Sequence, residues 1–99
     1  MVVDANGVRV DAPSDLARFH VEAPVGLDVD GALRRGGFGH LDVGGHDAHV
    51  SIAAVRRAVD GLVDLAAWGP QFEGMLRYAR SRGWLDDAGE LIRGHVDRT

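Results

Sequence analysis

The fold is decided by residues 39–51, which read GHLDVGGHDAHVS. Positions 44–47 are typical of a turn, and the residues on either side alternate between apolar and polar. Because successive strand residues point to opposite faces, a hairpin closed by this turn has one face of each kind. The apolar face holds Leu41, Val43, Ala48 and Val50, and the polar face holds His40, Asp42, His49 and Ser51.

Working outward, a second hairpin is expected at the start of the sequence. Asn6-Gly7 separates two alternating stretches, residues 2–5 and 8–11, and this dipeptide favours a type I′ turn. Residues 18–22 alternate like a strand, with a short helix over 14–20 as the alternative. Glycine and proline recur between Pro24 and Gly39, which predicts a loop-rich stretch.

The second half of the sequence has helical periodicity. Apolar residues from Ile52 to Ala66 recur at helical spacing, with Ser51 as the expected N-cap and a break expected at Asp60-Gly61. A further helix is predicted over 70–82, with Pro70 in its first turn. Its core-facing stripe is Phe72, Met75, Leu76 and Ala79.

The end of this last helix also carries local signals. Gly83 is a natural left-handed cap, which places Trp84 to fold back on Tyr78 or Ala79. Asp86 to Gly89 predicts a β-turn with glycine last. Residues 91–96 are expected to form a closing strand, because Gly94 weakens the alternative of a short helix.

These elements predict a single α+β domain over residues 1–99. We expect a small antiparallel sheet, built from the N-terminal hairpins within residues 2–52 and covered on one face by C-terminal helices over 52–82. A sheet of so few strands leaves open edges. We therefore expect a homo-oligomer, in the form of a two-fold homodimer.

The composition excludes several classes of protein. The chain has no cysteine, so disulfide frameworks and cysteine-based metal sites are excluded. All eleven basic residues are arginine, yet the net charge is −4 and neither half of the chain is basic, which argues against nucleic acid as a partner. Nowhere are there about 18 consecutive apolar residues, and no signal peptide is visible. We therefore expect a cytoplasmic protein with no membrane partner.

One constellation could carry chemistry, namely His40, Asp42 and His49 on the polar face of the hairpin. In the expected register Asp42 lies opposite His49 and could orient it as a general base. Two histidines and a carboxylate could also form a facial metal triad. The third interpretation is an ordinary solvated face with a cross-strand Asp42–His49 pair. We favour the third, and expect neither a metal nor a cofactor.

The sequence leaves two classes of function open. The first is a small non-catalytic binding domain that acts through a protein partner, a small ligand or its own dimer. The second is a small enzyme of the lyase, isomerase or cyclase type that uses His40, Asp42 and His49 for proton transfer. The aromatic residues predict core packing, with a ligand pocket or dimer surface as the alternative; they are Trp68, Phe72, Tyr78 and Trp84.

Overall fold

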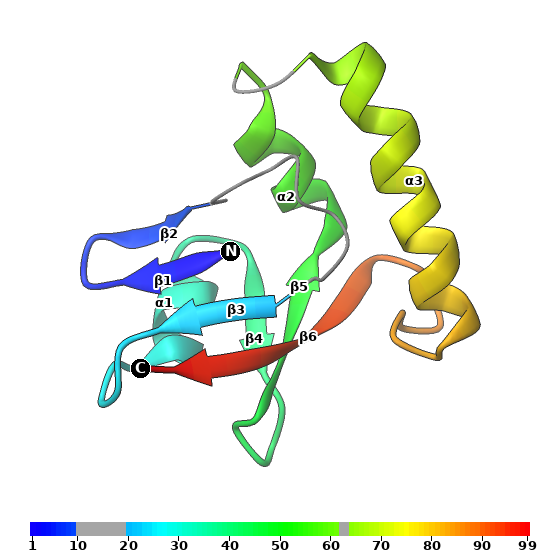
Figure 1. Cartoon of the computed structure of the whole chain (residues 1–99). Coiled ribbons are helices and arrows are strands. Elements are labelled where there is room, and N and C mark those ends of the chain that lie inside the picture. The colour runs from blue at the N-terminus through cyan, green and yellow to red at the C-terminus, as the bar shows by residue number, and fades with distance from the viewer. Residues whose placement is uncertain (10–19, 62–63) are drawn as a thin grey trace.

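The computed structural model describes residues 1–9, 20–61 and 64–99 (Figure 1). The strands are β1 (Val2–Asp4), β2 (Gly7–Arg9), β3 (His20–Ala23), β4 (Gly39–Leu41), β5 (Asp47–Ser51) and β6 (Leu91–Arg98). The helices are α1 (Val29–Arg35), α2 (Ile52–Val59) and α3 (Leu65–Ser81). The α+β class is therefore confirmed, whereas the helix proposed over 14–20 falls almost wholly outside the described residues.

Within the described residues, the strands form one six-stranded sheet in the order β2-β1-β3-β6-β5-β4. Strand β3 runs parallel to both of its neighbours, β1 and β6, whereas the other neighbouring pairs are antiparallel. The prediction of a small antiparallel sheet made of N-terminal hairpins is therefore wrong. Alternation along a strand indicates which residues share a face, but it does not indicate which distant strand becomes the neighbour.

Strand β6, from the C-terminal end of the chain, occupies the centre of the sheet. Its first half pairs with β5, and its last four residues pair with β3. The free side of its first half is covered by an antiparallel bridge between Leu85 and Ile92. The prediction of a strand over 91–96 is confirmed, and burial alternates along it, with Ile92, Gly94 and Val96 inside.

Both predicted hairpins form, but with different registers. The first turn is Ala5-Asn6, so Asp4 rather than Ala5 closes the pairing with Gly7. In the second hairpin His40 lies opposite His49, two residues away from the predicted pairing with Ser51. A slip of two residues keeps each side chain on its face, whereas a slip of one would reverse it. Val43 falls in the longer turn and is fully exposed.

Helix α1 was not predicted, because its residues lie in the glycine-rich stretch. The carboxylate of Asp28 accepts a hydrogen bond from the N–H of Gly31 and caps the helix. Val29, Ala32 and Leu33 then share one buried stripe. The helix contacts β4 at one end of the strand order and β1 and β2 at the other. The sheet therefore curls around α1 into a half-barrel.

The start and end of the other helices follow local signals. The hydroxyl of Ser51 accepts a hydrogen bond from the N–H of Ala54, as expected of the cap of α2, and Gly61 has a left-handed φ of 85° at the predicted break. Helix α3 starts at Leu65, so the prediction that Pro70 lies in the first turn is wrong. Its C-terminal end is as predicted: Gly83 has φ 76°, and the N–H of Trp84 donates to the carbonyl of Ala79.

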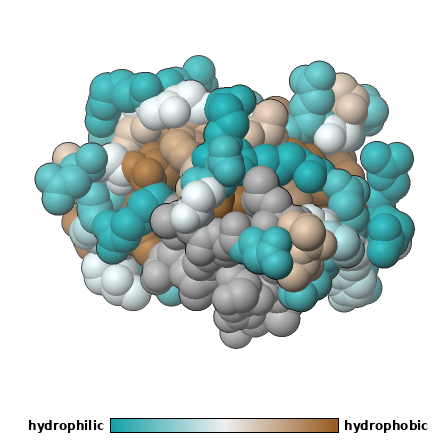
Figure 2. All heavy atoms as spheres, turned by 90° about the horizontal axis from the view of Figure 1, so that it is seen from above, coloured by the Kyte–Doolittle hydropathy of each residue, from teal (hydrophilic) through white to brown (hydrophobic). Residues whose placement is uncertain are grey.

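One hydrophobic core joins the sheet to α1, α2 and α3. It contains Val21 and Ile92 from the sheet, Leu33 from α1, Val55 from α2 and Phe72 from α3, among others. The expectation of cover by C-terminal helices alone is therefore incomplete, since α1 contributes as well. Helix α3 stands beside the end of the sheet where β6 begins (Figure 1). From above, hydrophilic residues surround patches of hydrophobic surface (Figure 2).

Candidate functional site: the outer face of the sheet

The side of the sheet that faces away from the core is polar, and we call it the outer face. Burial alternates along β3, β5 and β6, so every second side chain belongs to this face. On β3 to β6 it includes His20, Glu22, His40, Asp47, His49, Ser51, Leu91, Arg93, His95 and Asp97. Four of the five histidines in the sequence therefore lie on one surface.

The structure brings two of the three predicted site residues together. His40 and His49 lie directly opposite each other on β4 and β5. Their rings are stacked, with centroids 5.2 Å apart and planes inclined by 24°. Both side chains are half-buried. The pair is thus a consequence of the two-residue shift in register.

Asp42, the third predicted site residue, has a structural role in the turn. Its carboxylate accepts the N–H of Asp47 over 3.5 Å. Burial raises the pKa of Asp42, but hydrogen bonds from the N–H groups of Asp47, Gly45 and His46 outweigh it and hold the pKa below its ordinary value. No hydrogen bond among the described residues joins Asp42 to His49. The catalytic assignment of these residues stays a prediction.

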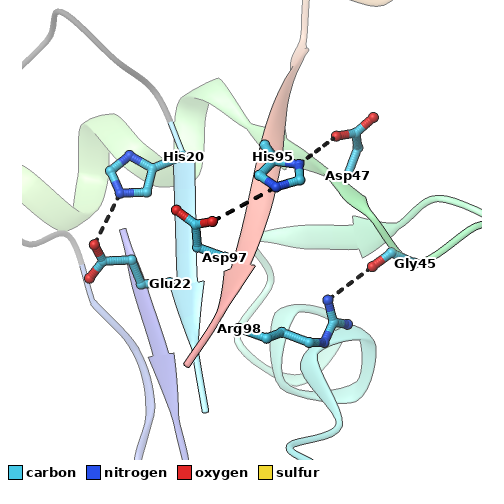
Figure 3. A network of polar contacts seen from close by, with 7 residues as sticks. All are labelled: His20, Glu22, Gly45, Asp47, His95, Asp97 and Arg98. Atoms are coloured by element: carbon cyan, nitrogen blue, oxygen red, sulfur yellow. Dashed lines mark hydrogen bonds and ion pairs between the residues drawn. The ribbon is translucent and has the colours of Figure 1, made fainter. Parts of the chain in front are cut away.

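A histidine–carboxylate network that the sequence did not reveal lies in the middle of the outer face (Figure 3). The Nδ1 atom of His95 is 3.7 Å from a carboxylate oxygen of Asp47, and its Nε2 atom is 3.8 Å from one of Asp97. On β3, the Nε2 atom of His20 lies 3.1 Å from a carboxylate oxygen of Glu22. These residues come from three segments of the chain, and only the insertion of β6 between β3 and β5 brings them together.

A second feature lies where α3 ends, and we call it the aromatic–arginine cluster: Tyr78, Arg82, Trp84 and Arg93. The rings of Tyr78 and Trp84 meet edge to face with centroids 5.7 Å apart. The guanidinium of Arg82 lies 5.8 Å from the centroid of the Trp84 ring, within range of a cation–π contact. The N–H of Arg93 donates to the carbonyl of Trp84 over 2.8 Å.

The cluster is continuous with the outer face. Arg93 lies opposite His49 in the pairing of β6 with β5, and His49 in turn stacks on His40. A row of aromatic and cationic side chains therefore crosses from the end of α3 to the edge strand β4. The sequence contained one signal for this, because Gly83 predicted the return of Trp84 onto Tyr78.

Within residues 1–9, 20–61 and 64–99, no group of three or more histidine or carboxylate side chains is arranged to hold a metal ion. None of the helices in the same ranges is long and apolar enough to cross a bilayer.

Comparison of the chain with protein-family models, with curated proteins and with solved structures finds no match. The outer face and the aromatic–arginine cluster are therefore the features from which a function can be inferred.

Proposed function

We propose that the chain is a non-catalytic binding domain and that the aromatic–arginine cluster, with the adjoining outer face, is its contact surface. The observation that carries the proposal is the different placement of the aromatic residues. Phe72 and Trp68 lie in the core. Tyr78, by contrast, is 56% exposed and packs on Trp84, which is half-buried against that core. Tyrosine, tryptophan and arginine are the residues most enriched where protein interfaces gain their binding energy.

The two arginines of the cluster can still bind a partner. Arg82 and Arg93 form no salt bridge with any described residue. A guanidinium without an internal carboxylate can form paired hydrogen bonds with one on a partner. Trp84 and Tyr78 supply apolar area beside these charges, so the cluster offers both kinds of contact within one patch.

Two observations favour binding over the enzyme alternative. The His95 side chain is 64% exposed, and its neighbours Asp97 and Glu22 are exposed as well. Proton transfer by a side chain gains from a site that excludes water, and the carboxylates around His95 lie open to it. Asp42, which would orient the imidazole in the enzyme interpretation, instead accepts hydrogen bonds from its own turn.

The charge and composition limit the kind of partner and the location. A net charge of −4 favours a protein partner over nucleic acid. The lack of cysteine fits a reducing compartment, and we place the protein in the cytoplasm.

Site-specific photo-crosslinking in the cells that make the protein tests this proposal. A photoreactive amino acid at position 78 should give a discrete adduct, and the same probe at the exposed Ala53 of α2 should give none. The variant Arg82→Gln should remove the adduct while leaving the thermal unfolding midpoint unchanged. Absence of an adduct at position 78, or equal adducts at both positions, would contradict the proposal.

A further inference from the structure

We infer that the partner is a second copy of this chain, bound through the outer face about a two-fold axis. This inference rests on the proposed function and names the occupant of the contact surface. It places the aromatic–arginine cluster of each copy against the opposite end of the other copy's outer face.

The two ends of the outer face carry opposite charge. Arg93 lies in the first half of β6 beside the cluster, and Asp97 lies near the end of the same strand. Both side chains are exposed on the same face, about 13 Å apart at the rise of a strand. Glu22 lies opposite Asp97 on β3, so a second carboxylate strengthens the negative end.

The negative end also has an exposed apolar side chain. Val25 is 72% exposed in the turn that follows β3. Its N–H donates to the carbonyl of Thr99, directly after the end of β6. We call Glu22, Val25 and Asp97 the acidic end. It offers carboxylates to the arginines of the cluster and an apolar contact to Trp84 and Tyr78.

His95 lies midway between Arg93 and Asp97 on β6. A two-fold axis that passes above this position, parallel to the plane of the sheet and perpendicular to β6, turns the outer faces of two copies toward each other. It brings Arg93 of one copy over Asp97 of the other, and the reverse pair forms by symmetry. Such self-complementarity is what an isologous interface requires. A standard interface takes about 800 Å² from each partner, which is roughly one seventh of the 5908 Å² surface of the described chain. The polar centre around His95 is typical of a wet, reversible contact.

Pairing through the β4 edge of the sheet is less favourable than pairing through the face. At the edge strand β4, the N–H of Leu41 already donates to the carboxylate of Asp30 over 2.9 Å. This bond occupies a donor that an added strand would need. The expectation of a homodimer thus remains, but its physical basis moves from open edges to charge complementarity across the outer face.

A charge swap tests the inference directly. The mass of the full chain, measured by sedimentation equilibrium over a range of concentrations, should rise from 10.6 kDa to twice that value. Arg93→Asp and Asp97→Arg should each weaken the dimer by about tenfold or more, because each places like charges together across the axis. The double variant should restore the wild-type constant. Arg57→Asp, an equal change of charge at an exposed position of α2, is the control and should have no effect.

Three outcomes would overturn the inference: a monomer at every concentration, a dimer indifferent to Arg93→Asp, or no rescue in the double variant. If circular dichroism shows that Arg93→Asp does not fold, Arg82→Gln and Asp97→Arg can be used instead, and each should weaken the dimer. A monomeric chain whose position 78 still crosslinks to a different protein would refute the dimer alone. In that case the proposed function would stand.

Discussion

The carboxylate of Asp30 in α1 accepts a hydrogen bond from the backbone N–H of Leu41 in β4 over 2.9 Å. Its second oxygen accepts from the side chain of Arg34 over 2.8 Å. The N–H of Leu41, followed by Arg34, holds the pKa of Asp30 below its ordinary value. The Asp30 side chain thus links α1, at the centre of the half-barrel, to the edge strand β4.

Removing this carboxylate should destabilise the edge strand. We expect Asp30→Ala to lower the thermal unfolding midpoint more than Asp30→Asn, because the amide oxygen of asparagine can still accept the N–H of Leu41. The exposed Asp87, replaced by alanine, is the matched control and should leave the midpoint unchanged. Equal midpoints for the two Asp30 variants would mean that the bond to Leu41 contributes nothing.

The loss of folding stability at low pH should depend on Asp30 and Asp86. The N–H of Leu91 is the main cause that lowers the pKa of Asp86, as that of Leu41 is for Asp30. A folded pKa below the unfolded value of about 3.9 adds stability at higher pH that is lost as pH falls through the folded pKa. Urea midpoints should therefore fall from about pH 4 downward, and less steeply in an Asp30→Asn/Asp86→Asn variant. If the urea midpoint of the double variant falls as steeply as that of the wild type, the two carboxylates do not cause the loss of stability.

The buried side chains of helix α3 should contribute strongly to the stability of the fold. Leu76 is 9% exposed and belongs to the same core as Phe72. Leu76→Ala should lower the free energy of unfolding by about 2–5 kcal/mol, because it removes buried methyl groups and leaves a cavity. Arg77→Ala, one position along on the exposed side, should change it by no more than about 0.5 kcal/mol. Chemical denaturation measures the free energy of unfolding of both variants. Equal losses for the two would show that Leu76 does not pack in the core.

The hairpin should distinguish the role of Asp42 from that of His49. We expect Asp42→Ala to lower the thermal midpoint, since the carboxylate binds N–H groups of its own turn. His49→Ala should cost no more than about 0.5 kcal/mol, as is usual for a strand-surface side chain. A loss of stability with His49→Ala as large as that with Asp42→Ala would show that the two residues act as a unit.

Local signals in the sequence were sufficient for the capping residues and for the stripe of α3. Ser51, Gly83 and the spacing of Phe72, Leu76 and Ala79 act through neighbours within one or two turns, so a short window contains their physics. Helix α1 was missed because the glycines around it favour loops, although Asp28 is an ordinary N-cap.

The sheet and the site depend on contacts between distant segments. His20, Asp47 and His95 become neighbours only because β6 enters between β3 and β5, and alternation within any one strand does not reveal that choice. The polar face of the second hairpin was predictable because a slip of two residues preserves it. The cross-strand partner of His49 was not predictable, since the same slip changes that partner from Asp42 to His40.

Photo-crosslinking from position 78 in the producing cells shows whether the aromatic–arginine cluster binds a partner. We expect one discrete adduct, at twice the chain's mass if the partner is a second copy. The adduct should disappear with Arg82→Gln and be absent with the probe at Ala53. No adduct from position 78 in a chain that unfolds at the wild-type temperature would contradict the proposed binding.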